Sequence, residues 1–115
     1  MNILSVTGEQ VPAGKGGSPS DTFDRSIATY QAGDATKSLT VTYCRYFGKA
    51  LAEQGIYDQE QEGVPVNRIA AILFLEQNPD TKEGRQYYNE TAAFLKLFEG
   101  FSLAQFKQKY GAVLS

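Results

Sequence analysis

A continuous apolar segment near the middle of the chain, Ile69–Leu75, most strongly constrains how this sequence can fold. A helix built from Ile-Ala-Ala-Ile-Leu-Phe-Leu is apolar on every side, so the segment has to be the central, buried element. Pro65 suits the first turn of a helix, and Asn78-Pro79-Asp80 combines a stop signal with the start of another helix. The alanines and the length favour a helix, and a buried strand is the alternative. We therefore predict a central helix over residues 65–77.

Three more helices are expected on either side of this segment. Ser38 can cap a helix that ends near Gln54, because its apolar residues form one broad face at helical spacing. A third helix is predicted from Pro79 to Glu99. Ser102-Leu-Ala-Gln105 has the pattern of a capping box, with Phe101 placed to pack on Phe106, and predicts a short fourth helix.

Residues 1–36 differ in composition from the rest of the chain. They are rich in Gly, Ser, Thr and Asp, and Val11–Asp21 in particular is not expected to hold a regular element for long. Ile3, Leu4 and Val6 could form a short strand, and Phe23–Tyr30 could form a short helical turn. Otherwise this region is predicted to be a flexible arm.

These patterns together predict an all-α fold, a small bundle of three to four helices with an extended, Gly/Ser/Pro-rich N-terminal arm. We expect two parts, a flexible N-terminal arm over residues 1–36 and a helical domain over residues 37–115. A chain of 115 residues fits one domain.

The composition excludes several classes of chemistry. The chain has no histidine and a single cysteine, Cys44, which removes histidine-based catalysis, internal disulfides and multi-thiolate metal sites. The glycine-rich stretch fails as a phosphate loop, because five residues separate Gly8 from Gly14 and Gly16 follows Lys15 where a hydroxyl is needed. The acidic pairs are expected to serve in loops and caps. We therefore predict no catalytic residue, no cofactor and no metal site, and a protein that is not an enzyme.

The apolar residues of the arm are predicted to bind a partner, because a disordered segment needs apolar anchors to offset the entropy lost on docking. These candidate partner-binding residues are Ile3, Leu4, Val6, Phe23, Ile27 and Tyr30.

A ridge of small residues on the expected helix over residues 38–54 forms a second candidate. Gly48 inside this helix costs about 1 kcal/mol relative to alanine, and a close approach of another helix or chain would explain it. The ridge consists of Val41, Cys44, Gly48 and Ala52. Either a helix of the same domain or another subunit can fill it, and Cys44 is interpreted as a small packed residue at its edge.

The function expected from these features is that of a non-catalytic protein-interaction or structural-assembly protein. The alternatives are a small nucleic-acid-associated regulator and an accessory subunit of an enzyme complex. The net charge of −2, with basic and acidic residues interleaved, disfavours nucleic acid and favours a protein partner or self-assembly. No apolar run approaches the length of a membrane span, and the start lacks a signal-peptide pattern. We therefore expect a cytoplasmic protein, or one assembled within a larger intracellular complex.

Overall fold

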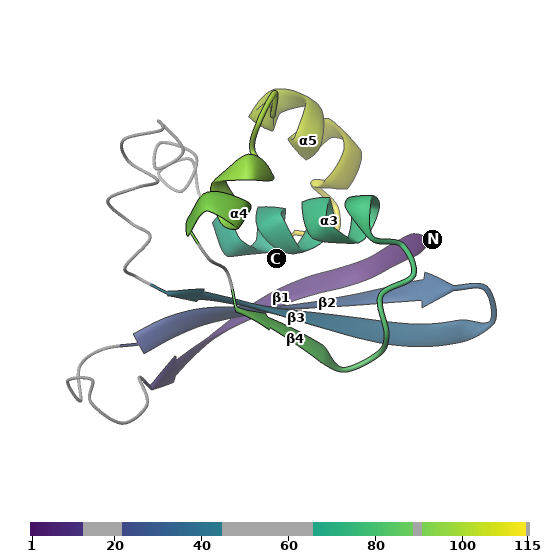
Figure 1. The fold of residues 1–115 in the computed structure, drawn as a ribbon. Coiled ribbons are helices and arrows are strands. Elements are labelled where there is room, and N and C mark those ends of the chain that lie inside the picture. Colours follow the sequence, from purple (N-terminus) through teal and green to yellow (C-terminus); the bar gives the residue numbers. More distant parts are fainter. Residues whose placement is uncertain (13–21, 45–65, 89–90, 115) are drawn as a thin grey trace.

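The computed structural model describes residues 1–12, 22–44, 66–88 and 91–114, which form strands and helices in two layers (Figure 1). In chain order the elements are β1 (Asn2–Pro12), β2 (Thr22–Ala32), β3 (Ala35–Cys44), α3 (Val66–Gln77), β4 (Arg85–Tyr88), α4 (Thr91–Lys96) and α5 (Leu103–Tyr110).

The strands form one mixed sheet in the order β1-β2-β3-β4. β1 pairs with β2 and β2 pairs with β3 in antiparallel register, whereas β4 runs parallel to β3. β2 and β3 are joined by Gly33 and Asp34, and Gly33 has φ +61°, as the first central position of a type II′ hairpin turn requires. The parallel pair needs a crossover connection, and α3 lies between β3 and β4 in the chain.

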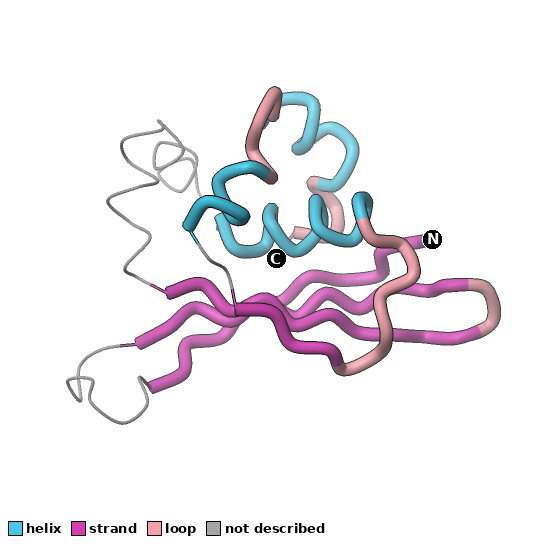
Figure 2. Tube along the Cα trace, viewed as in Figure 1, coloured by secondary structure: helices cyan, strands magenta, loops and turns pink. Residues whose placement is uncertain are grey.

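All three described helices cover the same face of the sheet (Figure 2). α3 lies directly on the sheet, in contact with β1, β2 and β3. Ile69, Ile72 and Leu75 of α3 are fully buried, and Leu39 and Val41 of β3 are buried on the facing strand. The main core is therefore a helix-on-sheet layer, and α3 is its central element, as the sequence predicts for Ile69–Leu75.

The predicted all-α bundle is wrong, because the chain folds around a four-stranded sheet. Residues 38–44, the beginning of the helix expected from Ser38 to about Gln54, belong instead to β3. Leu39 and Val41 are buried and alternate with the half-buried Ser38 and Thr40, which is the period of a strand with one covered face. β-branched residues also favour a strand at these positions. The remainder of the expected helix, residues 45–54, lies outside the described residues.

The prediction of an extended, flexible N-terminal arm is also wrong, because most of this region forms strands of the sheet. Residues 2–12 and 22–32 are the long strands β1 and β2, so the region expected to be flexible supplies half of the strands of the sheet. The expected short strand at Ile3–Val6 exists but is part of a longer one, and the expected helical turn over Phe23–Tyr30 is a strand. The boundary expected at residue 36 falls inside β3.

The helices after β3 agree better with the sequence patterns. The predicted helix over residues 65–77 is confirmed as α3. The third predicted helix is wrong in its first half, where Arg85–Tyr88 form β4, and its second half contains the short α4. α5 is confirmed, with Ser102 as its N-cap and the rings of Phe101 and Phe106 in contact at 5.4 Å between centroids.

Candidate functional site

Of the predicted partner-binding residues, the structure describes six side chains, and four of these are part of the core. Ile3, Val6, Tyr30 and Val41 are at most 7% exposed and belong to one buried cluster. Tyr30 is also held in the core by a hydrogen bond of 2.6 Å, which its hydroxyl donates to the Thr81 carbonyl. Burial raises the pKa of the Tyr30 hydroxyl, which keeps this donor protonated. These side chains stabilise the fold and are not accessible to a partner.

Two other arm residues remain accessible. Leu4 is 46% exposed on β1, next to the register shift between Ile3 and Ser5. Ile27 is half-buried and alternates along β2 with the buried Ser26 and Ala28, so it lies on the face of the sheet that carries no helix in the described part of the chain. Among the described residues, neither side chain is part of the core cluster or of the apolar side chains packed against it.

The predicted ridge of small residues does not exist as a helical surface. Val41 and Cys44 belong to the strand β3 and not to a helix. Gly48 and Ala52 lie outside the described residues. Phe23 and Cys44 are register partners on β2 and β3, and the structure does not describe their side chains.

The edge of the sheet formed by β4 provides a surface that the sequence patterns did not indicate. Among the described strands, β4 has a neighbour on one side only. It is four residues long and begins after Gly84, which has φ +70°. An edge strand has backbone N–H and carbonyl groups directed away from the sheet, and these can pair with a strand from another chain.

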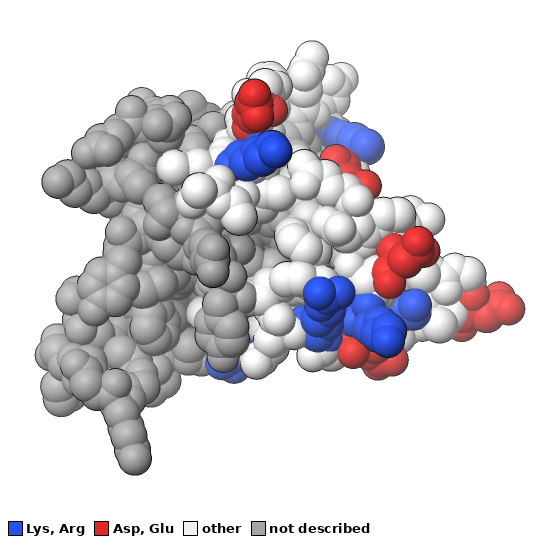
Figure 3. Space-filling model, viewed as in Figure 1, with Lys and Arg blue, Asp and Glu red and all other residues white. Residues whose placement is uncertain are grey.

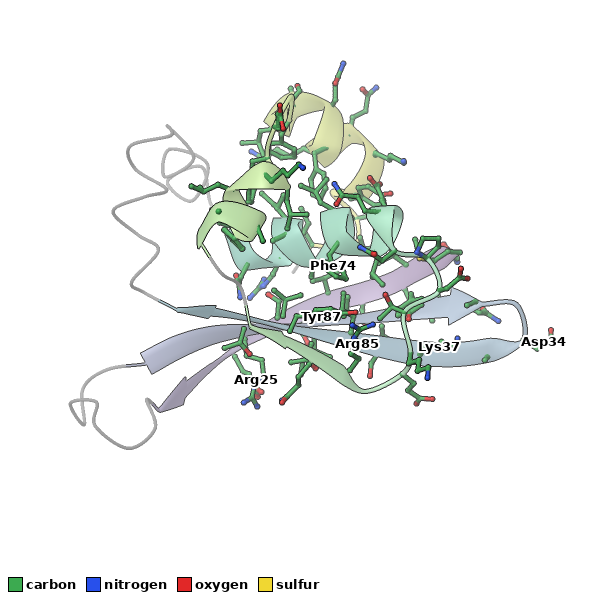
Figure 4. All side chains as sticks on the ribbon, viewed as in Figure 1. Arg25, Asp34, Lys37, Phe74, Arg85 and Tyr87 are labelled. Atoms are coloured by element: carbon green, nitrogen blue, oxygen red, sulfur yellow. The ribbon has the colours of Figure 1, made fainter. Side chains whose placement is uncertain are left out.

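Three side chains form a stack on this edge, with Tyr87 in the middle (Figure 4). The Phe74 ring, from α3, lies 4.2 Å from the Tyr87 ring between centroids, at 50° between planes. On β4 itself, the Arg85 guanidinium carbon lies 4.7 Å from the Tyr87 ring centroid. Because the stack starts from α3, it holds the exposed Arg85 side chain in place. We call Phe74, Tyr87 and Arg85 the edge stack.

The guanidinium of Arg85 has no anionic partner in the part of the chain that the structure describes. Arg25, by contrast, forms an ion pair of 3.2 Å with Glu9 on the open face of the sheet. Lys37 lies two residues before Leu39, the register partner of Arg85. Two residues along a strand and one strand across place Lys37 and Arg85 about 8 Å apart between Cα atoms. Figure 3 shows basic side chains gathered over the region of β4, with acidic side chains beside them.

A second surface feature is an open cavity of about 680 Å³ between the start of β1 and the ends of α3 and α5. Glu76 in its wall accepts a hydrogen bond from the Tyr110 hydroxyl and lies 3.4 Å from Lys109 Nζ. Burial, and then the hydrogen bond to Glu76, raise the pKa of the Tyr110 hydroxyl, so this group stays protonated at neutral pH. The cluster is internally paired, and it holds α5 to α3.

Within the described ranges, no group of three or more His, Cys, Asp or Glu side chains is placed to hold a metal ion. In those ranges no helix has the length and hydrophobicity of a membrane span either.

Comparison of the chain with protein-family models, with curated proteins and with solved structures gave no match. The functional argument therefore depends on the geometry of the described residues.

The sequence patterns do not predict the edge stack, because Tyr87 lies within the helix predicted from Pro79 to Glu99. A signal was present in Gly84-Arg85-Gln86-Tyr87-Tyr88, where a glycine interrupts the helix and aromatic residues follow. The contact with Phe74, thirteen positions earlier, depends on how α3 lies on the sheet. No pattern local to β4 contains that information.

Proposed function

We propose that this chain is a non-catalytic protein-interaction module that binds an extended, acidic segment of a partner protein along β4. The observation that carries the proposal is the edge stack, which holds an exposed Arg85 on an edge strand, with no anionic partner for its guanidinium among the described residues. The partner segment would add a strand to the sheet and place a carboxylate against Arg85.

The backbone of β4 supports the affinity part of this proposal. Strand addition uses main-chain hydrogen bonds, which do not depend on the partner's sequence. Arg85 and Gln86 are exposed, so no side chain of the described residues covers this edge fully. The shortness of β4 is a common device against uncontrolled edge pairing, and it limits the site to a short segment.

The edge stack supports the specificity part. Arginine and tyrosine are enriched among the residues that contribute most to protein interfaces. A guanidinium already held against an aromatic ring loses less conformational entropy on binding a carboxylate than a free side chain does. Its planar donors match a carboxylate in a bidentate arrangement. Arg85 is therefore the residue on which we expect affinity to depend most.

Two further expectations accompany the proposal. Acidic side chains lie beside the basic ones near β4 (Figure 3), which favours a protein segment over a polyphosphate backbone. The single cysteine and the absence of histidine support a non-catalytic, intracellular protein, cytoplasmic or within a larger complex.

The test compares capture of partners by the full chain and by two charge-reversal variants. Arg85→Glu should lose the partner, because the carboxylate of the partner then meets a like charge. Lys96→Glu makes the same charge change at an exposed position of α4, outside the edge stack, and should retain it. Thermal melts of both variants check that each one folds. A stoichiometric partner captured equally by both variants would exclude the β4 edge as the binding site.

A further inference from the structure

Arg68 of α3 makes a close contact with the opposite edge of the sheet, at Gly8 of β1. A Cβ atom placed on Gly8 would lie 2.7 Å from Arg68 Nη2 and 2.8 Å from Nε, so only glycine leaves room for the guanidinium. The Nε of Arg68 is buried and has no hydrogen-bond partner. Neither an ion pair nor a hydrogen bond joins this guanidinium to the described ranges of the chain.

Ser26 brings a second unpaired polar group to the same place. It is the register partner of Gly8 on the neighbouring strand and is 0% exposed, and within the described part of the chain its Oγ has no hydrogen-bond partner. Side chains directly opposite each other on antiparallel strands point to the same face, with Cβ atoms about 5 Å apart. The hydroxyl of Ser26 is therefore directed to the layer beneath α3 that contains the guanidinium of Arg68.

The first turn of α3 adds a third source of positive potential. Arg68 is the third residue of the helix, and the first turn contains no acidic residue. N–H groups at the start of a helix have no partner within the helix, and the dipole makes this end positive. A cation in the first turn is unfavourable unless an anion lies near it. Burying unpaired donors is also unfavourable.

We propose that Arg68, Ser26 and the first turn of α3 form a binding site for a small tetrahedral oxyanion of the phosphate class. The site offers a guanidinium, a hydroxyl and helix N–H groups, which are the kinds of donor that bind a tetrahedral oxyanion. Gly8 is exposed and Arg68 is only half-buried, so an ion can enter from solvent.

This site is separate from the edge stack, because β1 and β4 are the two outer strands of the sheet. The C-terminal segment covers part of the β1 edge, where the Val6 N–H donates to the Val113 carbonyl at 3.1 Å, and Gly8 lies two residues further along. The oxyanion site therefore does not depend on the partner proposed for β4.

The experiment is a chemical-shift titration of the full chain with inorganic phosphate and methyl phosphate, with acetate and chloride at matched ionic strength as controls. Either phosphate should shift the amide signals of Gly8 and Ser26, and the tighter of the two identifies the source of the oxyanion. Arg68→Gln should weaken binding by about tenfold or more, and Ser26→Ala by about threefold to tenfold. Gly8→Ala should also weaken binding, because the added methyl group displaces the guanidinium.

Lys96→Gln removes a positive charge at an exposed position of α4, outside both proposed sites; it is the charge-matched control and should leave phosphate binding unchanged. Because Arg68 and Gly8 are accessible to solvent, the Arg68→Gln and Gly8→Ala variants should fold as the natural chain does, and a thermal melt verifies this. Acetate binding as tight as phosphate, equal phosphate affinity in Arg68→Gln, or the absence of any saturable shift at Gly8 and Ser26 would each overturn the proposal.

Discussion

Replacement of Tyr30 by phenylalanine tests how the sheet is tied to the loop that precedes β4. The ring of Tyr30 is 0% exposed, and its hydroxyl donates a hydrogen bond of 2.6 Å to the carbonyl of Thr81, a residue that is 3% exposed. Phenylalanine keeps the ring packing and removes only the hydroxyl. The Thr81 carbonyl is then left buried without this donor, which costs about 1–3 kcal/mol.

The expected loss of stability is large enough to measure by thermal or urea unfolding. For a chain of this length the unfolding entropy converts about 1–3 kcal/mol into a fall in Tm of about 4–12 °C. Tyr87→Phe is the control, since the half-buried Tyr87 ring contacts Phe74 and Arg85, and its hydroxyl has no hydrogen-bond partner among the residues that the structure describes. That variant should lose less than about 0.5 kcal/mol. Equal losses in the Tyr30 and Tyr87 variants would refute the hydrogen bond to Thr81.

Three other perturbations have defined outcomes. Ile72→Ala should cost about 2–5 kcal/mol because Ile72 is fully buried, whereas Leu73→Ala, at a partly buried position, should cost clearly less in the same unfolding assay. Ser102→Ala should cost about 0.5–1 kcal/mol, because the long 3.5 Å hydrogen bond to the Gln105 N–H places this N-cap at the weak end of its range. The raised pKa of Tyr30 predicts stability that is complete below the unfolded tyrosine pKa of about 10 and is lost as pH rises above it, so unfolding curves of the natural chain and Tyr30→Phe should converge at high pH.

The part of the fold that could be predicted from the sequence is the part with complete local signals. α3 has a start signal, a stop signal and an apolar centre, and α5 has the Ser102 cap together with the Phe101–Phe106 contact. These features act within one or two turns of a helix, so a local pattern is sufficient to identify them.

The sheet was missed for two physical reasons. Along residues 38–42 the apolar Leu39 and Val41 fit a strand period, but the aromatic residues that follow also fit a helical face, and the longer pattern was preferred. Residues 1–36 are rich in Gly, Ser, Thr and Asp, a composition typical of an irregular arm, and the register shift between Ile3 and Ser5 also interrupts the alternation along β1. Strand pairing of β1 with β2 then supplies hydrogen bonds that the composition of either segment alone does not predict.

The candidate sites were less predictable still, because each one joins distant parts of the chain. Phe74 and Tyr87 meet through the position of α3 on the sheet, and Gly8 meets Arg68 across sixty positions of sequence. Ile3 and Val6 were predicted to be apolar anchors for a partner, but they are apolar because they pack in the core.

Amide hydrogen exchange of β4, measured in the free chain and in the complex with its captured partner, tests the central claim most directly. The proposal predicts that N–H groups of Arg85–Tyr88 directed away from β3 exchange more slowly in the complex, while those of β1 near Gly8 do not change. A complex that forms without added protection in β4, or with protection confined to β1, would contradict the claim that this protein binds its partner along the β4 edge.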